Sequence, residues 1–350
     1  MSTAETDPGG HGFAAEVRDA VTPRAVALVV GVFVLQLGFI LSYIGAFHSP
    51  SLHRLPVAVA APPQVAGPVA RQLDGLPGDP VDARTARSEQ DARRLLLHRE
   101  VTAAIVIDPR GATDTLLIAS AAGPAAADAA ANLAERLESA RGRDVRVTDI
   151  RPPGPKDARG LSSFYLAIGW MVGGYLAASI LGLAGARSPN PPRIVIRLCA
   201  LAAYAVASGA GGAWIAGPLL GALDGHFLRL WGIGTLTVFA AAAFTAALQV
   251  LFGLVGIGVA ILLFVVLGNP SAGGAYSMSL LPEFWRVIGD RLPTGAATTL
   301  IRDTVYFTGY GTARAWWVLA GYAAAGIVIA LAASMARFGR GARTGGADRA

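Results

Sequence analysis

A stretch of 23 residues without a charged side chain, residues 164–186, limits what this chain can fold into. As a helix rising about 1.5 Å per residue, it covers the roughly 30 Å hydrocarbon core of a bilayer. It predicts a membrane span over residues 161–186, the alternative being a buried helix of a large soluble protein. Gly169, Gly173 and Gly174 give this helix a face with little side chain, on which a neighbouring helix can pack closely.

The composition also indicates a polytopic membrane protein. Of the 350 residues, 53% are hydrophobic and 15% are charged, whereas soluble domains have about 25% charged residues. Lys156 is the only lysine, so the net charge of +6 comes from arginines spread over loops and chain ends. This distribution favours membrane orientation over nucleic-acid binding. Cys199 is the only cysteine, which excludes an intrachain disulfide.

Further apolar runs predict five more spans. They cover residues 25–47, 198–220, 232–250, 252–268 and 315–335. The first run exceeds the core of a signal peptide and is interpreted as an uncleaved anchor. The 38 uncharged residues of 231–268 would make a helix of about 57 Å, so they need two spans. Gly212 and Gly217 are small packing positions of the third span.

Residues 1–24 form a lead-in before the first span. Within it, residues 13–21 are either an amphipathic surface helix or a solvated segment.

Between the first two spans, residues 48–160 have the pattern of a soluble α/β domain. Short runs rich in β-forming residues predict four strands, at residues 56–61, 102–108, 114–120 and 144–150. Helical spacing predicts helices at residues 65–73, 88–98 and 125–141. Strands that alternate with helices predict a small sheet covered by helices. The expected fold class is therefore a six-span α-helical membrane protein with an α/β domain inserted between spans 1 and 2.

Arginine placement predicts the orientation of these spans. Six spans put the amino terminus, the carboxyl-terminal arginines and the connection with Arg187, Arg193 and Arg197 on the cytoplasmic side, as the positive-inside rule prefers. The inserted domain then lies outside the cell membrane. The three prolines of residues 187–197 predict a connection without a continuous helix. Span 6 is followed by a cytoplasmic tail.

Residues 269–314, between spans 5 and 6, are neither plainly soluble nor plainly spanning. Residues 282–290 and 293–306 each begin with a proline, as short helices often do. They mix apolar side chains with charged ones, which predicts a half-inserted segment at the outer interface, with an ordinary loop as the alternative. The side chains of Arg302 and Asp303 either line a transport path at this interface or are exposed to solvent.

Motifs for chemistry are absent from the sequence. There is no Walker A motif, metalloprotease motif or nucleophile elbow, so we expect no enzyme activity and no cofactor. His48 and His53 are five residues apart without a nearby cysteine or carboxylate, which favours an interfacial position over a metal site. Gln36 and Gln249 are polar residues inside spans, where they either hold helices together or line a path for a polar solute.

Four stretches carry a family resemblance: SYIGAFHSPSLHRLPVAV at 42–59, IASAAG at 118–123, DARGLSSFYLAIGWMVGGYLAA at 157–178 and LGNPSAGGAYSMSLLPEFWRVIGDRLPTGAATTLIRD at 267–303. With the order of spans, they make the chain similar to the ABC-2-type permease superfamily, in particular its phage-infection-protein-like branch. The stretches run along nearly the whole chain. None of them is a catalytic signature.

The resemblance implies an export subunit that works as a homodimer or in a larger complex with a separate ATPase. Such permeases move lipids, polymers or drugs outward, and the ATPase binds cytoplasmic coupling helices. The corresponding place here is residues 187–197, with Arg187, Arg193 and Arg197. It is short and lacks acidic residues, which departs from that pattern. The resemblance therefore also leaves a membrane scaffold or receptor open, which would act through the outer domain. Besides an ATPase, we expect membrane lipid as a partner. We do not expect the chain to bind nucleic acid.

Overall fold

The computed structural model describes residues 22–184 and 190–347, with side chains as far as Arg337. Within this part of the chain, five helices are long and apolar enough to cross a membrane. They are α2 (Pro23–Phe47), α6 (Ser162–Ala184), α7 (Pro191–Trp214), α8 (Phe227–Phe252) and α12 (Ala313–Ala347). The predicted helix at residues 13–21 and Arg187 lie outside the described residues.

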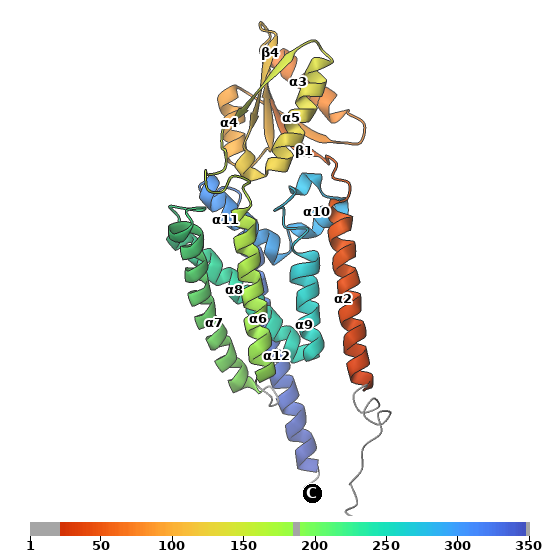
Figure 1. Cartoon of the computed structure of the whole chain (residues 1–350), viewed down its shortest axis with the longest axis vertical. Helices are drawn as coiled ribbons and strands as arrows, with labels where there is room; N and C mark the ends of the chain where they lie inside the picture. The colour runs from red at the N-terminus through yellow and green to blue at the C-terminus, as the bar shows by residue number, and fades with distance from the viewer. Residues whose placement is uncertain (1–21, 185–189, 348–350) are drawn as a thin grey trace, which may run out of the picture.

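The long helices form a bundle with an α/β unit at one end (Figure 1). We call this the domain end, and the opposite end, where α2 begins and α12 finishes, the distal end. Helix α8 runs through the middle of the bundle and packs against α6, α7 and α12. Helix α2 stands at the side and is exposed along most of its length. Such an apolar exposed surface is compatible with a membrane protein.

The uncharged residues 231–268 form two helices, but the second is short. Helix α9 (Leu254–Ile261) continues as the π-helical segment η3 (Leu262–Leu267), and together they make a 14-residue apolar helix of about 21 Å. This falls short of the roughly 30 Å hydrocarbon core. Helix α7 also continues as a π-helical segment, η2 (Ile215–Leu219), and both π segments lie toward the domain end.

A single residue, Gly253, reverses the chain between α8 and α9. Its φ of 61° and ψ of −132° lie in a region that side chains exclude. We expect Gly253→Ala to lower the free energy of unfolding by about 2 kcal/mol, as backbone strain of this kind does. Reversible unfolding in mixed micelles, followed by tryptophan fluorescence, measures the change.

Gly258→Ala is the matched control for that substitution. Gly258 lies within α9, and a Cβ there would meet only Leu35 at an ordinary distance of 3.7 Å. Because alanine is the better helix former, stability should stay the same or rise by up to about 1 kcal/mol. Equal losses for the two variants would contradict a special role for the turn.

Between α2 and α6 the chain forms a five-stranded mixed sheet in the order β2-β1-β3-β4-β5. The strands are β1 (Leu55–Ala60), β2 (Val81–Ala86), β3 (Ala103–Val106), β4 (Thr113–Ile118) and β5 (Asp144–Asp149). All neighbours pair in parallel except β3 and β4. The four strands that the sequence predicts are present. Strand β2 was not predicted, because its letters VDARTA contain no run of β-branched or aromatic residues.

Helices cover both faces of this sheet. Helices α3 (Pro63–Asp74) and α5 (Pro124–Ser139) pack on one face, against Val57 and Val59. Helix α4 (Glu89–Leu97) packs on the other, against Ala58 and Ala60. The apolar core on the α4 side continues without a break into the core of the bundle. The α/β unit and the bundle therefore share one core on that side.

The segment between α9 and α12 contains the 3₁₀ turn η4 (Met278–Leu280), α10 (Glu283–Gly289) and α11 (Pro293–Tyr306). The two helices predicted there are present. Nearly all residues of α11 are buried between the α/β unit and the bundle, so its side chains contact protein groups, and the position of both helices at an outer interface stays a prediction. Charged side chains of α11 are buried there because they meet groups from other parts of the chain.

Candidate functional site: the junction of the α/β unit and the bundle

Five polar side chains from three distant parts of the chain meet where the α/β unit joins the bundle. We call this set the junction. It consists of Arg99 from the end of α4, Asp157 from the connection before α6, and Arg302, Asp303 and Tyr306 from α11. Arg302, Asp303 and Tyr306 lie within four positions of each other on α11, so their side chains leave the helix in neighbouring directions.

Arg99 connects the α/β unit to α11. Its Nε lies 3.1 Å from Oδ1 of Asp303, and its guanidinium carbon lies 4.9 Å from the ring centre of Phe307. The Asp303 side chain is only 3% exposed, against 24% for Arg99. Arg99 has a φ of 64°, the left-handed conformation usual just past a helix end, where glycine is preferred. A strained arginine at this position indicates that its contacts outweigh the backbone cost.

Asp157 joins the same helix to the start of α6. Its Oδ2 accepts a hydrogen bond of 2.6 Å from the Tyr306 hydroxyl, and its Oδ1 accepts one of 2.9 Å from the backbone N–H of Ser162, the first residue of α6. The carboxylate thereby satisfies one of the unpaired amides at that helix end. One aspartate thus holds α6 and α11 together.

Arg302 is buried as the two carboxylates of the junction are, with 5% of its surface exposed. Its Nη1 donates to the carbonyl of Gly273 at 2.9 Å, whereas Nε and Nη2 have no hydrogen-bond partner among the described residues. Burial of Arg302 and Asp303 excludes the solvated surface that was one of their two predicted settings. The junction contains two guanidinium groups and two carboxylates, so its charges balance, as burial requires.

A second polar cluster holds the helices together near the distal end. Arg197 on α7 donates to the side-chain oxygen of Gln249 on α8 and to the carbonyl of Ala178 on α6. Gln249 in turn donates to the carbonyl of Ser179 at 3.3 Å. We call this set the distal clamp. Hydrogen bonds between helices are the expected use of polar groups within spans.

These positions revise the predicted connection around Arg193 and Arg197. Helix α7 begins at Pro191, so both arginines are helical and no loop extends over residues 191–197. The prolines do not bar this helix, because its first turn needs no N–H group from them. The Asn190 side chain caps the helix through the amide of Arg193, at 3.1 Å.

The remaining predicted site residues occupy different settings. Gln36 is exposed on α2, whereas Gln249 belongs to α8. A Cβ on Gly174 would lie 2.5 Å from the Val238 carbonyl oxygen, and one on Gly212 would overlap the Trp170 ring. A Cβ on Gly173 would lie 3.1 Å from the Tyr204 hydroxyl. A Cβ on Gly217 would make only ordinary van der Waals contacts, and a Cβ on Gly169 would meet no atom within 4 Å.

The histidines near the first span bind backbone groups. The Nδ1 atoms of His48 and His53 lie 3.0 Å from the carbonyl of Ile44 and 2.7 Å from the carbonyl of Ser51. Within the described residues, no group of three or more histidine, cysteine or acidic side chains is placed to hold a metal ion. The amide of His53 donates to the Ser279 carbonyl at 2.8 Å, which adds a further link between the α/β unit and residues 269–314.

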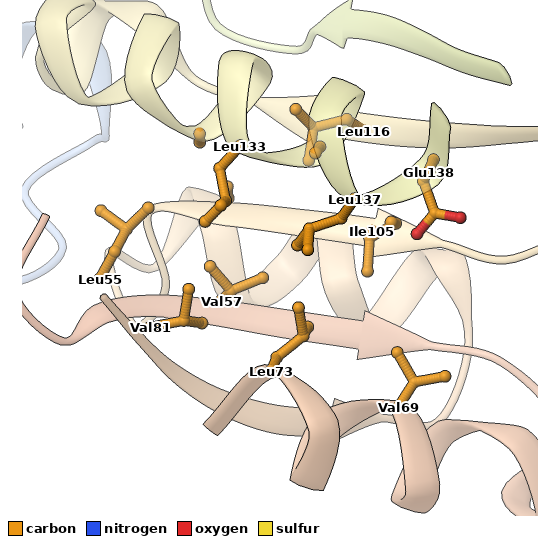
Figure 2. Close-up of a pocket in the computed structure, with 13 residues that line it drawn as sticks. Leu55, Val57, Val69, Leu73, Val81, Ile105, Leu116, Leu133, Leu137 and Glu138 are labelled. Atoms are coloured by element: carbon orange, nitrogen blue, oxygen red, sulfur yellow. The ribbon is translucent and has the colours of Figure 1, made fainter. Parts of the chain in front are cut away.

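The α/β unit also contains an apolar cavity between α3, α5 and the sheet (Figure 2). Its volume is about 30 Å³, roughly the space of one water molecule. Aliphatic side chains line it, and Glu138 is the one acidic group among them. Burial raises the pKa of Glu138, although Arg141 at 2.8 Å opposes the shift. Burial also opposes ionisation of the neighbouring Asp114, but hydrogen bonds from Arg143 and from the Asp108 amide outweigh it and lower the pKa of Asp114.

These opposite shifts predict how the stability of the α/β unit depends on pH. Glu138 has its pKa raised by folding, so the folded state becomes more stable as the pH falls and this carboxyl group takes up a proton. Asp114 has its pKa lowered by folding, so its contribution to stability is lost only when the pH falls below the usual pKa of an aspartate. We expect hydrogen-exchange protection in α5 to rise when the pH falls from 7 to 5. Glu138→Gln should abolish this rise, and Asp114→Asn should reduce it, because the charge and the hydrogen bond of Asp114 also raise the pKa of Glu138. Protection that is independent of pH in the unmodified protein would contradict the shift of Glu138.

Of the junction residues, the sequence singled out Arg302 and Asp303 but missed Arg99, Asp157 and Tyr306. Tyr306 lies four residues after Arg302, a helical spacing that could have indicated a shared face. Arg99 and Asp157 are about 200 and 150 residues away from their partners, and only the fold brings them together. Comparisons with protein-family models, curated proteins and solved structures give no match to this chain.

Proposed function

We propose that the chain is a multi-pass protein of the cell membrane with six spans, the fifth formed by α9 and η3. Both termini then lie in the cytoplasm and the α/β unit lies outside. The positions of the arginines support this orientation. Arg24, Arg193 and Arg197 lie in the first turns of α2 and α7, and Arg337 lies toward the end of α12, all near the distal end. A distal end in the cytoplasm satisfies the positive-inside rule.

In that membrane, we propose that the chain acts as the membrane subunit of an ABC-2-type exporter. It would move an amphipathic substrate, a lipid-like molecule or a drug outward, as a homodimer or larger complex with a separate ATPase. The observation that carries this proposal is the attachment of α6 at both ends. Its first amide is bonded to Asp157 of the junction, and the carbonyls of Ala178 and Ser179 accept from the distal clamp.

This attachment gives a physical route between the two sides of the membrane. A force on the start of α7 acts on Arg197, which is bonded directly to α6 and α8. The start of α6 is bonded through Asp157 to Tyr306 on α11, and α11 is paired through Asp303 with Arg99 of the α/β unit. A displacement at the cytoplasmic end can therefore reach the outer unit through packed, hydrogen-bonded elements, as coupling between distant sites requires.

Purification of the tagged chain from native membranes in a mild detergent tests the export function. We expect a nucleotide-hydrolysing protein to copurify, and its hydrolysis rate to fall when Arg197 is replaced by alanine. Cys199→Ser is the matched control, because Cys199 is exposed on the same helix two residues further on, and it should leave the rate unchanged. Absence of any ATPase from a complex that retains its other partners would contradict the proposal.

A scaffold or receptor is the second candidate, because the α/β unit that contains the cavity of Figure 2 has an apolar core of its own on that side. The cavity is lined only by residues of the α/β unit, on the sheet face opposite the core shared with the bundle. At about 30 Å³ the cavity is too small for a ligand, so a partner of such a scaffold would bind the outer surface of the α/β unit. Deletion of residues 53–160 distinguishes the two candidates. A scaffold loses its partners while the spans stay inserted, whereas an exporter keeps its ATPase.

A further inference from the structure

The guanidinium group of Arg302 has one edge that no other group in the described part of the chain uses. Its Nη1 donates to the Gly273 carbonyl at 2.9 Å, whereas Nε and Nη2 are buried without an acceptor. The N–H groups of Nε and Nη2 point the same way and form an edge that can bind both oxygens of a carboxylate. Leaving this edge unpaired is costly, because only 5% of the Arg302 surface is exposed.

Asp303 does not fill this edge, although it is the carboxylate next to Arg302 in the sequence. Its Oδ1 lies 3.1 Å from Nε of Arg99, so Asp303 is directed toward the α/β unit. Adjacent residues of a helix leave it about 100° apart and do not face each other. Arg302 is accordingly directed elsewhere, toward Gly273.

Asp157 is the carboxylate on the side of α11 where the free edge of Arg302 lies. Tyr306, which donates to Asp157 at 2.6 Å, follows Arg302 by four residues and therefore shares its helix face. Gly274, next to the carbonyl that Arg302 binds, lies against the first turn of α6, since a Cβ there would overlap the Phe164 ring. Arg302 also lies within electrostatic range of Asp157.

We propose that Asp157 is a two-position switch at the start of α6. In the first position, which the structure shows, its carboxylate accepts hydrogen bonds from the Tyr306 hydroxyl and the Ser162 amide. In the second position it leaves both groups and accepts from Nε and Nη2 of Arg302. Tyr306 and Arg302 are one turn apart, so the exchange shifts the connection before α6 along α11 and releases the first amide of α6.

The two positions are balanced in hydrogen bonding. The first leaves two donors of Arg302 unpaired, and the second leaves the Ser162 amide and the Tyr306 hydroxyl unpaired. Unpaired buried donors carry similar costs, so neither position lies far below the other in free energy. An element with two discrete arrangements is what coupling between distant sites requires. The switch would serve the proposed export route in this way, but it rests on the geometry of the junction alone.

Hydrogen exchange of the Ser162 amide, measured on the full-length protein in mixed micelles, tests the switch. Tyr306→Phe removes a partner of the first position, so Asp157 should move to Arg302 and the Ser162 amide should exchange about tenfold faster, the effect of losing one hydrogen bond. Adding Arg302→Gln removes the second position and should make the exchange slow again. A purely structural role for Arg302 predicts the opposite, because a second lost contact would speed exchange further.

Arg286→Gln, added to Tyr306→Phe, is the matched control. Arg286 is a partly buried arginine of α10 that donates to the His53 carbonyl at 3.4 Å, so its loss should leave the exchange fast. Arg302→Met is the second variant, because it removes the free donors without adding a polar group, and it should slow the exchange as Arg302→Gln does.

Two results would overturn the switch: an unchanged rate in Tyr306→Phe, or a rate that stays fast after Arg302 is replaced. Slow exchange at the centre of α8 identifies the variants that keep their fold, and if Arg302→Gln loses it, Arg302→Met decides. No ATPase takes part in this measurement. A failed exchange test therefore leaves the export proposal standing, and absence of an ATPase leaves the switch standing.

Discussion

Asp303→Ala is expected to lower the free energy of unfolding by about 3 kcal/mol, the lower end of the range for removing one partner of a buried ion pair. The loss leaves Arg99 without its carboxylate and Arg302 with less compensating charge in a buried setting. The lower end applies because Arg99 keeps 24% of its side chain exposed and regains some water. Reversible unfolding in mixed micelles measures the change, and its tryptophan signal comes from the bundle and residues 269–314, which contain all six tryptophans.

Asp290→Ala is the matched control, because it removes an ion pair from the same segment. Asp290 lies 3.0 Å from Arg314, but both side chains are about half exposed, so the expected cost is below about 1 kcal/mol. A double variant with Arg99→Met and Asp303→Leu should recover most of the loss, since it leaves no unpaired charge. If Asp303→Ala and Asp290→Ala cost the same, the junction does not hold the α/β unit in the way described.

Gly174→Leu is the second substitution with a large expected effect. The Cβ alone would lie 2.5 Å from the Val238 carbonyl oxygen and 2.8 Å from the Ala241 Cβ, both on α8. Because the first of these atoms belongs to the backbone, α6 and α8 must move apart to admit a side chain. Overpacking of this kind costs about 3 kcal/mol. The unfolding midpoint in mixed micelles and the yield of monodisperse protein should both fall.

Gly169→Leu, on the same helix, separates this packing effect from any effect of leucine in a span. Its Cβ position is open, so stability should change by no more than about 0.5 kcal/mol. A loss in Gly169→Leu as large as that in Gly174→Leu would show that the side of α6 facing α8 is not the one that matters.

The long helices could be predicted from the sequence because their signal is local. A charge-free run of sufficient length specifies an apolar helix whatever its neighbours are, and α2, α6, α7, α8 and α12 all lie within or around predicted runs. The boundaries were less accurate. Helix α7 begins at Pro191, seven residues before the predicted start, because a helix accepts prolines and arginines in its first turns.

The junction could be predicted only in part, because the environment of a charged side chain depends on residues elsewhere in the chain. Arg302 and Asp303 resemble surface residues when only residues 293–306 are considered. They are buried because Arg99 supplies a counter-charge from the α/β unit and Gly273 supplies a carbonyl. Strand β2 was missed for a related reason. Its alternation is weak, and its pairing with β1 determines its conformation.

The π-helical segment η3 has a consequence for the first span. Ser42 on α2 donates to the carbonyl of Val266, and Thr294 on α11 donates to the carbonyl of Phe264 at 3.1 Å. Apolar contacts alone allow a helix in lipid to slide and rotate, because lipid tails are as apolar as its side chains. The bond from Ser42 therefore sets the depth and rotation of α2. Since η3 also binds the helix that carries Asp303, α2 cannot change its depth independently of the segment that holds the α/β unit.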